Sequence, residues 1–218
     1  MARVFLGGES MIRISNVSLS FGDKKIIDNL TFTFDSGKKY ALMGESGIGK
    51  STILGIISGT LKEYSGKVTT RSEKIAYAFQ DSRLFPWLTV FENVLIVASE
   101  KNSCSLARAK EILCNLGLSD SMEKYPNELS GGMKQRVSLA RALMYEGDIL
   151  LLDEPFRALD EATAKQVAEY VFSVAKNKTV IFVTHDKTDT KYADVVLLAD
   201  TSPVSELRMV KSSSITTE

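Results

Sequence analysis

One stretch of the chain has the residue types and the spacing that hold a chain of phosphates. Residues 44–51 match the pattern G-x-x-x-x-G-K-[ST]. Glycines let backbone N–H groups converge on an anion, Lys50 would add positive charge beside the β- and γ-phosphates, and the hydroxyl of Ser51 can ligate Mg²⁺. A strand-sized apolar run precedes the loop and a helical segment follows it, which argues against a chance match. The predicted nucleotide-binding residues are Gly44, Glu45, Ser46, Gly47, Ile48, Gly49, Lys50, Ser51 and Thr52.

An acidic pair follows a second apolar run. Residues 149–152 are Ile-Leu-Leu-Leu, and Asp153 and Glu154 come directly after them. Ligands bind at the carboxyl ends of strands in open α/β sheets, so Asp153 is predicted to hold Mg²⁺ and Glu154 to take the proton of an attacking water. Acidic residues are also common just before helices, as N-caps. The strand and the phosphate loop together favour the catalytic interpretation, and Pro155 fits a chain that leaves the sheet.

A second glycine-rich loop, of a different kind, lies at residues 129–133. Ser130 is a good helix N-cap, and Gly131 and Gly132 expose backbone donors, so the segment predicts a second anion site without a lysine. A plain capped helix start is the competing interpretation. Because one nucleotide needs only the first loop, the second implies a catalytic site shared between two copies of the protein.

The elements that must position these residues alternate along the chain. An opening block of alternating apolar and polar residues predicts an antiparallel, β-rich subdomain. Beyond it, short apolar strands alternate with helical periods, which predicts an α/β fold with a mainly parallel sheet. The predicted strands are 40–43, 75–79, 149–152, 180–184 and 195–199, and the predicted helices include 109–116, 133–144 and 161–175.

The predicted organisation has a core domain and two end segments. The core domain spans residues 11–200, and within it about residues 81–135 lack strand signals and are expected to form a helical subdomain insertion. Residues 1–10 show no period and are expected to be a leader remnant or a non-native addition. Residues 201–218 are polar and are expected to form a flexible tail.

The composition excludes several classes of function. Lys+Arg and Asp+Glu both number 27, so the net charge is zero and no nucleic-acid surface is expected. One His and two Cys cannot build a usual zinc site. Cys104 and Cys114 would stand about 15 Å apart along a helix, too far for a disulfide. No run approaches the roughly 20 apolar residues of a membrane span, and no signal-peptide core opens the chain. We therefore expect a soluble, cytoplasmic protein whose membrane role comes through a partner.

The motifs and their order resemble the ATP-binding subunits of ABC transporters over about residues 11–200. Residues 129–135 resemble the ABC signature, and residues 158–160 the D-loop. Gln80 resembles the Q-loop glutamine, His185 the switch histidine, and Phe21 the aromatic that stacks on adenine. Phe21 and His185 could instead be ordinary core residues.

The resemblance implies a P-loop NTPase core and a mechanism of hydrolysis. Two subunits are expected to close head to tail on two ATP molecules, so that residues 130–132 of one subunit contact the γ-phosphate held by the other. The resemblance implies that Glu154 is the general base and that His185 contacts the γ-phosphate. It also implies that Gln80 senses Mg²⁺ and the attacking water and that Asp160 links the two sites.

Residues 84–88, Leu-Phe-Pro-Trp-Leu, are unusually apolar for a loop. Packing inside the helical subdomain is one interpretation. The other is a docking site, near Leu84, Phe85 and Trp87, for a short cytoplasmic helix of a membrane subunit, since in the family this contact follows the Q-loop. The run from Arg83 to Val94 resembles importers of the nitrate, sulfonate and taurine type.

The resemblance thus implies an ATP-hydrolysing subunit at the cytoplasmic face of the cell membrane, bound to a transmembrane permease and indirectly to a substrate-binding protein. The alternatives are a stand-alone ABC protein of translation or DNA repair, and a regulatory module without turnover, against which an intact Glu154 argues. Two features depart from the family pattern. Arg157 stands where small residues or Ser are frequent, and Asp189-Thr190 replaces Glu-Ala.

Overall fold

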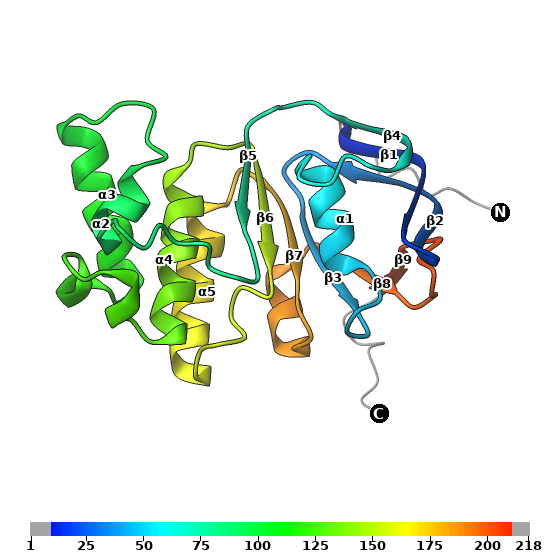
Figure 1. Cartoon of the computed structure of the whole chain (residues 1–218). Helices are drawn as coiled ribbons and strands as arrows, with labels where there is room; N and C mark the ends of the chain where they lie inside the picture. The colour runs from blue at the N-terminus through cyan, green and yellow to red at the C-terminus, as the bar shows by residue number, and fades with distance from the viewer. Residues whose placement is uncertain (1–9, 211–218) are drawn as a thin grey trace. The chain divides into compact units, whose positions relative to one another are not determined.

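The computed structural model describes residues 10–210, and Figure 1 shows their helices and strands. The described residues up to Glu73 and from His185 onward form one compact unit, and Lys74–Thr184 form a second. Residues 1–10 are predicted to be a leader remnant or a non-native addition. Of these, residues 1–9 lie outside the described residues, whereas Ser10 begins the first strand. No helix among the described residues is long and apolar enough to cross a membrane.

The first unit contains a three-stranded antiparallel sheet in the order β2-β1-β4. Its strands are β1 (Ser10–Phe21), β2 (Lys24–Asp35) and β4 (Ser65–Thr70). Ile14 pairs with Phe32 on one side and with Val68 on the other. Ile12 and Ile14 are buried and Arg13 is exposed, the period of two that a half-buried strand requires.

The same unit holds the strand that leads into the phosphate loop. β3 (Lys39–Gly44) pairs in parallel with β8 (Val195–Ala199), and α1 (Lys50–Ile57) follows the loop. Tyr40 packs edge-to-face on Phe34 and its hydroxyl accepts a hydrogen bond from Asp35 N at 2.8 Å. Burial raises the pKa of Tyr40 to about 12, so this phenol stays neutral in the core.

The segment from Thr201, expected to be a polar tail, folds back onto this unit as far as Val210. β9 (Arg208–Val210) pairs antiparallel with β8, and the 3₁₀ helix η3 (Lys187–Tyr192) precedes β8. Val204 is fully buried, and it exchanges backbone hydrogen bonds with Ile26 and Asp28 at 2.9 Å. Two isolated apolar residues, Val204 and Leu207, anchor a stretch whose average composition is polar. Residues 211–218 lie outside the description.

The second unit is built on three parallel strands in the order β5-β6-β7. They are β5 (Ile75–Ala78), β6 (Ile149–Asp153) and β7 (Thr179–Val183), with Leu150 paired to Ala76 and to Val180. Every residue of β6 and β7 is buried, as continuous apolar runs in parallel sheets usually are. α5 (Glu161–Val174) packs on β7 through Phe172 and Phe182, whose ring centroids are 5.0 Å apart.

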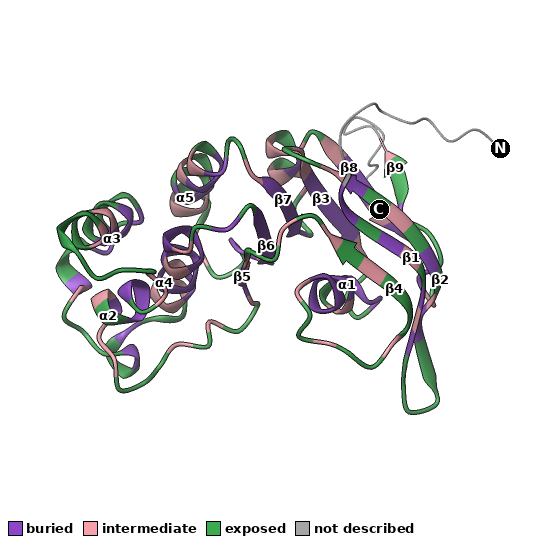
Figure 2. Cartoon of the chain, turned by 90° about the horizontal axis from the view of Figure 1, so that it is seen from above, coloured by how far each residue is buried: buried purple, intermediate pink, exposed green. Residues whose placement is uncertain are grey.

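Described residues 81–135 contain no strand, and their helices form the rest of the second unit. They are α2 (Val90–Leu95), α3 (Ser103–Asn115), η1 (Ser119–Ser121), η2 (Pro126–Glu128) and the start of α4 (Gly131–Met144). α3 buries Ala109, Ile112 and Leu113 on one face, and Figure 2 shows that α3, α4 and α5 each have a buried and an exposed side. α4 contacts both α2 and β5, so it connects the helices with the strands.

Candidate functional site

The loop between β3 and α1 is shaped by three glycines with positive φ. The values are 146° at Gly44, 75° at Gly47 and 126° at Gly49. A Cβ on Gly44 would lie 2.3 Å from the Ala199 carbonyl oxygen, and one on Gly49 would lie 2.9 Å from Ile26 Cγ2. Any other residue at these two positions would therefore both strain the backbone and collide with a neighbouring strand.

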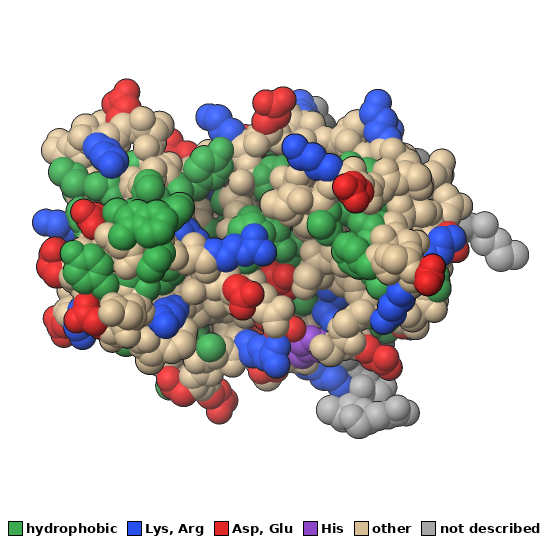
Figure 3. Space-filling model, in the orientation of Figure 1, with side chains coloured by type: hydrophobic (Ala, Val, Ile, Leu, Met, Phe, Trp, Pro, Cys, Tyr) green, Lys and Arg blue, Asp and Glu red, His purple; other side chains and the backbone are tan. Residues whose placement is uncertain are grey.

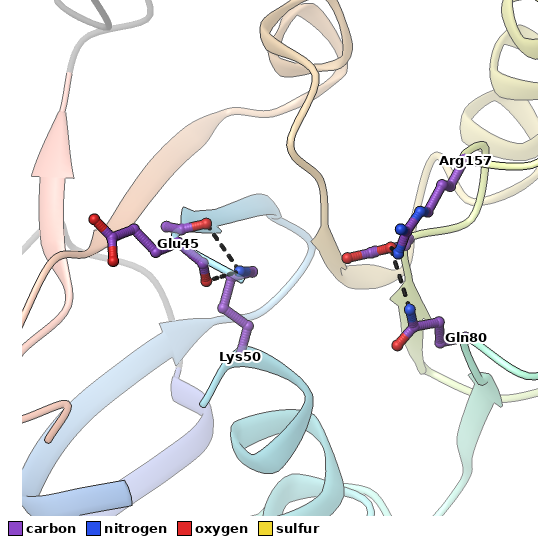
Figure 4. A network of polar contacts seen from close by, with 6 residues as sticks. Glu45, Lys50, Gln80 and Arg157 are labelled. Atoms are coloured by element: carbon purple, nitrogen blue, oxygen red, sulfur yellow. Dashed lines mark hydrogen bonds and ion pairs between the residues drawn. The ribbon is translucent and has the colours of Figure 1, made fainter. Parts of the chain in front are cut away.

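Lys50 lies over this loop. Its Nζ donates to the carbonyl oxygens of Gly44 at 2.9 Å and Glu45 at 2.6 Å, and the residue is only 5% exposed (Figure 4). α1 begins at Lys50 after Gly49, an N-cap that has no side chain to cap the first turn of the helix. Ser51 and Thr52 stand in this first turn, exposed and half-buried. Backbone donors and a buried ammonium thus surround one loop, which is the chemistry of a phosphate site.

Phe21 and His185 belong to the same unit, and both are exposed. Phe21 ends β1 and is 53% exposed, so it is not a core residue. It opens the hairpin whose second strand carries Ile26, the residue that packs against Gly49. His185 is also exposed, which argues against a satisfied buried histidine.

In the second unit, β6 delivers the acidic pair. Asp153 is 3% exposed and its Oδ2 accepts a hydrogen bond from the Tyr77 hydroxyl at 3.5 Å. Burial, and then the nearby charge of Asp153, raise the pKa of Tyr77 above its usual range. The phenol therefore remains a hydrogen-bond donor to the carboxylate. Sequence reasoning missed Tyr77, although a polar aromatic on a strand beside the acidic pair was a visible signal.

Glu154, the residue directly after β6, has an unusual backbone conformation. Its φ is 49°, a left-handed value that costs free energy in a residue with a side chain and that often occurs at functional sites. Its Oε2 accepts from Gln80 Nε2 at 3.4 Å and forms an ion pair with Arg157 Nη1 at 2.7 Å (Figure 4). The structure thus brings together Gln80 and Glu154, two predicted site residues, and adds Arg157, which the sequence marked only as a departure.

The second glycine loop leads into α4, and its two glycines have different surroundings. Ser130 caps the helix, since its Oγ accepts from Met133 N at 3.3 Å. A Cβ on Gly131 would meet no atom within 4 Å, whereas one on Gly132 would lie 2.8 Å from the Ala158 carbonyl oxygen. Gly131 thus has open space beside its Cα, whereas Gly132 packs closely against residues 158–159, and both stay predicted anion-binding positions.

Asp160 also stabilises the start of a helix. It is the N-cap of α5, and its Oδ1 accepts from Thr163 N at 3.0 Å. The hydrogen bond from the Thr163 backbone lowers the pKa of Asp160. Like Ser130, it is held in place by the start of the helix that it caps, and it remains exposed.

The loop of residues 84–89, here named the Trp87 loop, is held from beneath by a buried amide. Asn93 is fully buried; its Nδ2 donates to the carbonyl oxygens of Phe85, Leu88 and Thr89 at 2.9–3.1 Å. Its Oδ1 accepts from Phe85 N at 2.8 Å. One side chain therefore holds the backbone of this loop at Phe85, Leu88 and Thr89.

A half-buried arginine of α4 holds the residues just before the Trp87 loop. Arg141 donates to the carbonyl oxygens of Ser82 and Arg83 at 2.9 Å, and burial lowers the pKa of Arg141. With its backbone fixed in this way, the loop leaves Phe85 37% and Trp87 69% exposed. Figure 3 shows hydrophobic side chains gathered over this part of the second unit. Sequence reasoning gave no role to Asn93, although it lies in the run from Arg83 to Val94, or to Arg141, which lies outside the quoted motifs.

A glycine phosphate loop between a strand and a helix, and an acidic pair at the end of a parallel strand, define a P-loop NTPase of the α/β class. Residues 27–157 match the family model described as ABC transporter. The chain belongs to this family, as an ATP-binding subunit with ATPase activity. The predicted fold class and the predicted family are thereby confirmed.

Among its relatives are proteins named aliphatic sulfonates import ATP-binding protein SsuB. The one from Bacillus cereus is 39% identical over 188 residues, which cover 80% of this chain and 75% of the relative. The one from Corynebacterium glutamicum is 42% identical over 192 residues, which cover 85% and 79%. A solved dimeric structure of an ATP-binding cassette in a post-hydrolysis state, bound to ADP and Pi, has a TM-score of 0.82 and 30% identity, and covers 93% of this chain and 99% of that one.

Proposed function

We propose that this chain is the ATP-hydrolysing subunit of an ABC importer, with aliphatic sulfonates as the first substrate class to test. The observation that carries the proposal is the phosphate loop with its buried Lys50 in a chain 39% identical to sulfonate-import subunits. The test is uptake of a radiolabelled sulfonate by cells that lack this chain and regain it. Purified protein should also release phosphate from ATP. The stand-alone role in translation or DNA repair is not favoured, because the named relatives serve import.

The phosphate loop is proposed to bind the triphosphate of ATP. The N–H groups of residues 45–51 and the start of α1 would donate to phosphate oxygens. Lys50 would exchange its two carbonyl partners, Gly44 and Glu45, for the β- and γ-phosphates, which accept more strongly because they are charged. Phe21 would lie against the adenine, since its exposed ring belongs to the hairpin that packs on Gly49.

The residues also fit Mg²⁺. The ion prefers oxygen ligands and uses one or two carboxylates together with substrate phosphates, rather than a ready-made cage. Ser51 offers a hydroxyl and Asp153 a buried carboxylate, while Gln80 would contact the ion from the loop that follows β5. The described residues contain no group of three or more His, Cys, Asp or Glu that could hold a metal ion. Bound Mg²⁺ would neutralise charge on the phosphates.

Glu154 is proposed as the general base. Its carboxylate would take a proton from water while the water oxygen bonds to the γ-phosphorus and the bond to the β–γ bridging oxygen breaks, which yields ADP and phosphate. Gln80, hydrogen-bonded to Glu154 Oε2, would orient that water. His185 would donate to the γ-phosphate from its exposed position after β7.

The site is proposed to be completed by a second copy of the chain. Ser130 and Gly131 are exposed at the start of α4, where they would contact the γ-phosphate bound by the partner copy. Asp160, exposed at the start of α5, would reach across the same interface. The dimeric cassette with ADP and Pi, which resembles this chain at a TM-score of 0.82, supports this arrangement.

Alanine at the two glycines of the signature separates packing from catalysis. Gly131→Ala adds a methyl group where no atom lies within 4 Å, so the melting temperature should not fall, yet ATPase activity should fall at least about tenfold because the methyl faces the partner's phosphate. Gly132→Ala places its methyl against the Ala158 carbonyl and should destabilise the fold by about 1–3 kcal/mol. Calorimetry and phosphate release measure both effects. Full activity in Gly131→Ala would contradict the shared site.

The Trp87 loop is proposed to dock the transmembrane permease at the cytoplasmic face of the membrane. Leu84, Phe85 and Trp87 present apolar surface on a backbone that Asn93 holds rigid, which suits a groove for a short amphipathic helix. A substrate-binding protein would act through the permease and would not touch this chain. The choice of substrate would then lie with those partners.

Trp87→Ala should separate hydrolysis from coupling. The side chain is 69% exposed, so the free energy of unfolding should change by no more than about 0.5 kcal/mol, and phosphate release by the isolated chain should be unchanged. Affinity for the permease that co-purifies with the wild-type chain should fall by about 30-fold, as for an aromatic anchor. Tyr125→Ala, which removes a 46% exposed aromatic outside the loop, is the matched control. Equal affinity in the two variants would refute the docking assignment.

A further inference from the structure

The glutamate proposed as the general base is paired with an arginine three residues later in the chain. Arg157 Nη1 lies 2.7 Å from Glu154 Oε2, the same oxygen that accepts from Gln80. The Glu154 side chain is 9% exposed and that of Arg157 is 69% exposed. The carboxylate of Glu154 is therefore nearly buried, whereas most of the Arg157 side chain is in contact with solvent.

A tight turn brings the arginine back over the glutamate. Arg157 N donates to the Glu154 carbonyl oxygen at 3.3 Å, which closes a four-residue turn with Pro155 in the second position, where its fixed φ is favoured. Glu154 itself has the left-handed φ of 49°. The pairing is thus favoured by the backbone and does not depend on a chance approach of a long side chain.

The ion pair conflicts with proton transfer. A carboxylate that abstracts a proton must present a lone pair to the attacking water, and a guanidinium that donates to the same oxygen competes for that lone pair. We propose that Arg157 is a positioning residue that restrains Glu154 in the resting subunit, and that the Arg157–Glu154 ion pair must open before turnover. This inference rests on the proposed function of Glu154. Because Arg157 is mostly exposed, its side chain has room to swing away.

Removing the arginine should accelerate hydrolysis by the isolated chain. In Arg157→Ser we expect kcat for ATP to rise about two- to fivefold, the range that corresponds to an ion pair open to solvent on one side, with KM changed by less than about twofold. Arg157→Lys keeps a cation within reach and should stay near the wild-type rate. High salt should raise the wild-type rate towards that of Arg157→Ser, because salt screens the pair.

Two controls make the test specific. Arg208→Ser removes an arginine of β9 that forms an ion pair with Asp200 instead of with Glu154, and it should leave kcat unchanged. In a Glu154→Gln background, Arg157→Ser should have no further effect, because the charge that it restrains is gone. Circular dichroism and thermal melting confirm that each variant is folded.

An unchanged or lower kcat in Arg157→Ser would overturn the inference, and so would an Arg157→Lys rate as high as that of Arg157→Ser. These failures differ from a failure of the proposed function. In the latter case the wild-type chain would not hydrolyse ATP, or Glu154→Gln would remain active. If only the inference fails, Glu154→Gln loses turnover while Arg157 has no restraining effect.

Discussion

Replacing Glu154 with Gln is expected to lower ATP turnover by about 10²–10⁴-fold, the usual contribution of a general base. The amide has the same shape but cannot accept the proton of the attacking water. ATP binding should persist, because the phosphate loop and Lys50 are untouched. Single-turnover phosphate release and equilibrium binding of a fluorescent ATP analogue measure the two effects separately.

The same variant also tests the shared site. With ATP bound and not hydrolysed, Glu154→Gln should accumulate as a dimer in light scattering, whereas the wild-type chain should return to its resting state. Asp148→Asn is a matched control, since it removes a carboxylate that stands just before the same strand. Near-normal hydrolysis in Glu154→Gln would refute its role as base, and a monomer at all ATP concentrations would count against the partner's contribution.

Replacing Lys50 with Ala is expected to weaken ATP binding by roughly 10- to 100-fold. The estimate follows from losing charge-assisted hydrogen bonds to phosphate, which are worth about 1.5–3 kcal/mol. Isothermal titration with ATP and Mg²⁺ measures the change directly.

Lys62→Ala removes an exposed lysine just beyond α1 and serves as the control for the loss of one positive charge. Because Lys50 is buried and bonds to two carbonyl groups of its own loop, the melting temperature of Lys50→Ala without nucleotide should be recorded as well. Unchanged ATP affinity in a folded Lys50→Ala protein would remove the phosphate loop from the site.

Periodic and motif-bearing segments of this chain could be predicted from sequence because their signals are local. The residues Ala109, Ile112, Leu113 and Leu116 recur at helical spacing and are all buried in the structure. The phosphate loop could be predicted from the spacing of its residues alone, because its glycines adopt backbone conformations that other residues rarely adopt.

The features that the sequence could not predict depend on contacts between segments that are far apart in the sequence. No local pattern reveals the contacts of Asn93 and Arg141, yet they hydrogen-bond to the backbone of residues 82–89 from two different helices. Gly132 resembles an anion-binding glycine, and only the approach of the Ala158 carbonyl shows that it is also needed for packing. The stretch after Thr201 looked like a tail because composition averages conceal two buried apolar residues, Val204 and Leu207.

The buried amide of Asn93 has an evolutionary consequence. Because it ties down main-chain atoms of the loop, exchanging the exposed residues Phe85 and Trp87, together with the half-buried Leu84, should alter the surface chemistry without reshaping the backbone beneath. If the loop docks the permease as proposed, a few substitutions at its tip would accommodate a new membrane component while the residues of the hydrolytic site stay the same. Grafting these three side chains between related subunits would then change which permease the subunit binds.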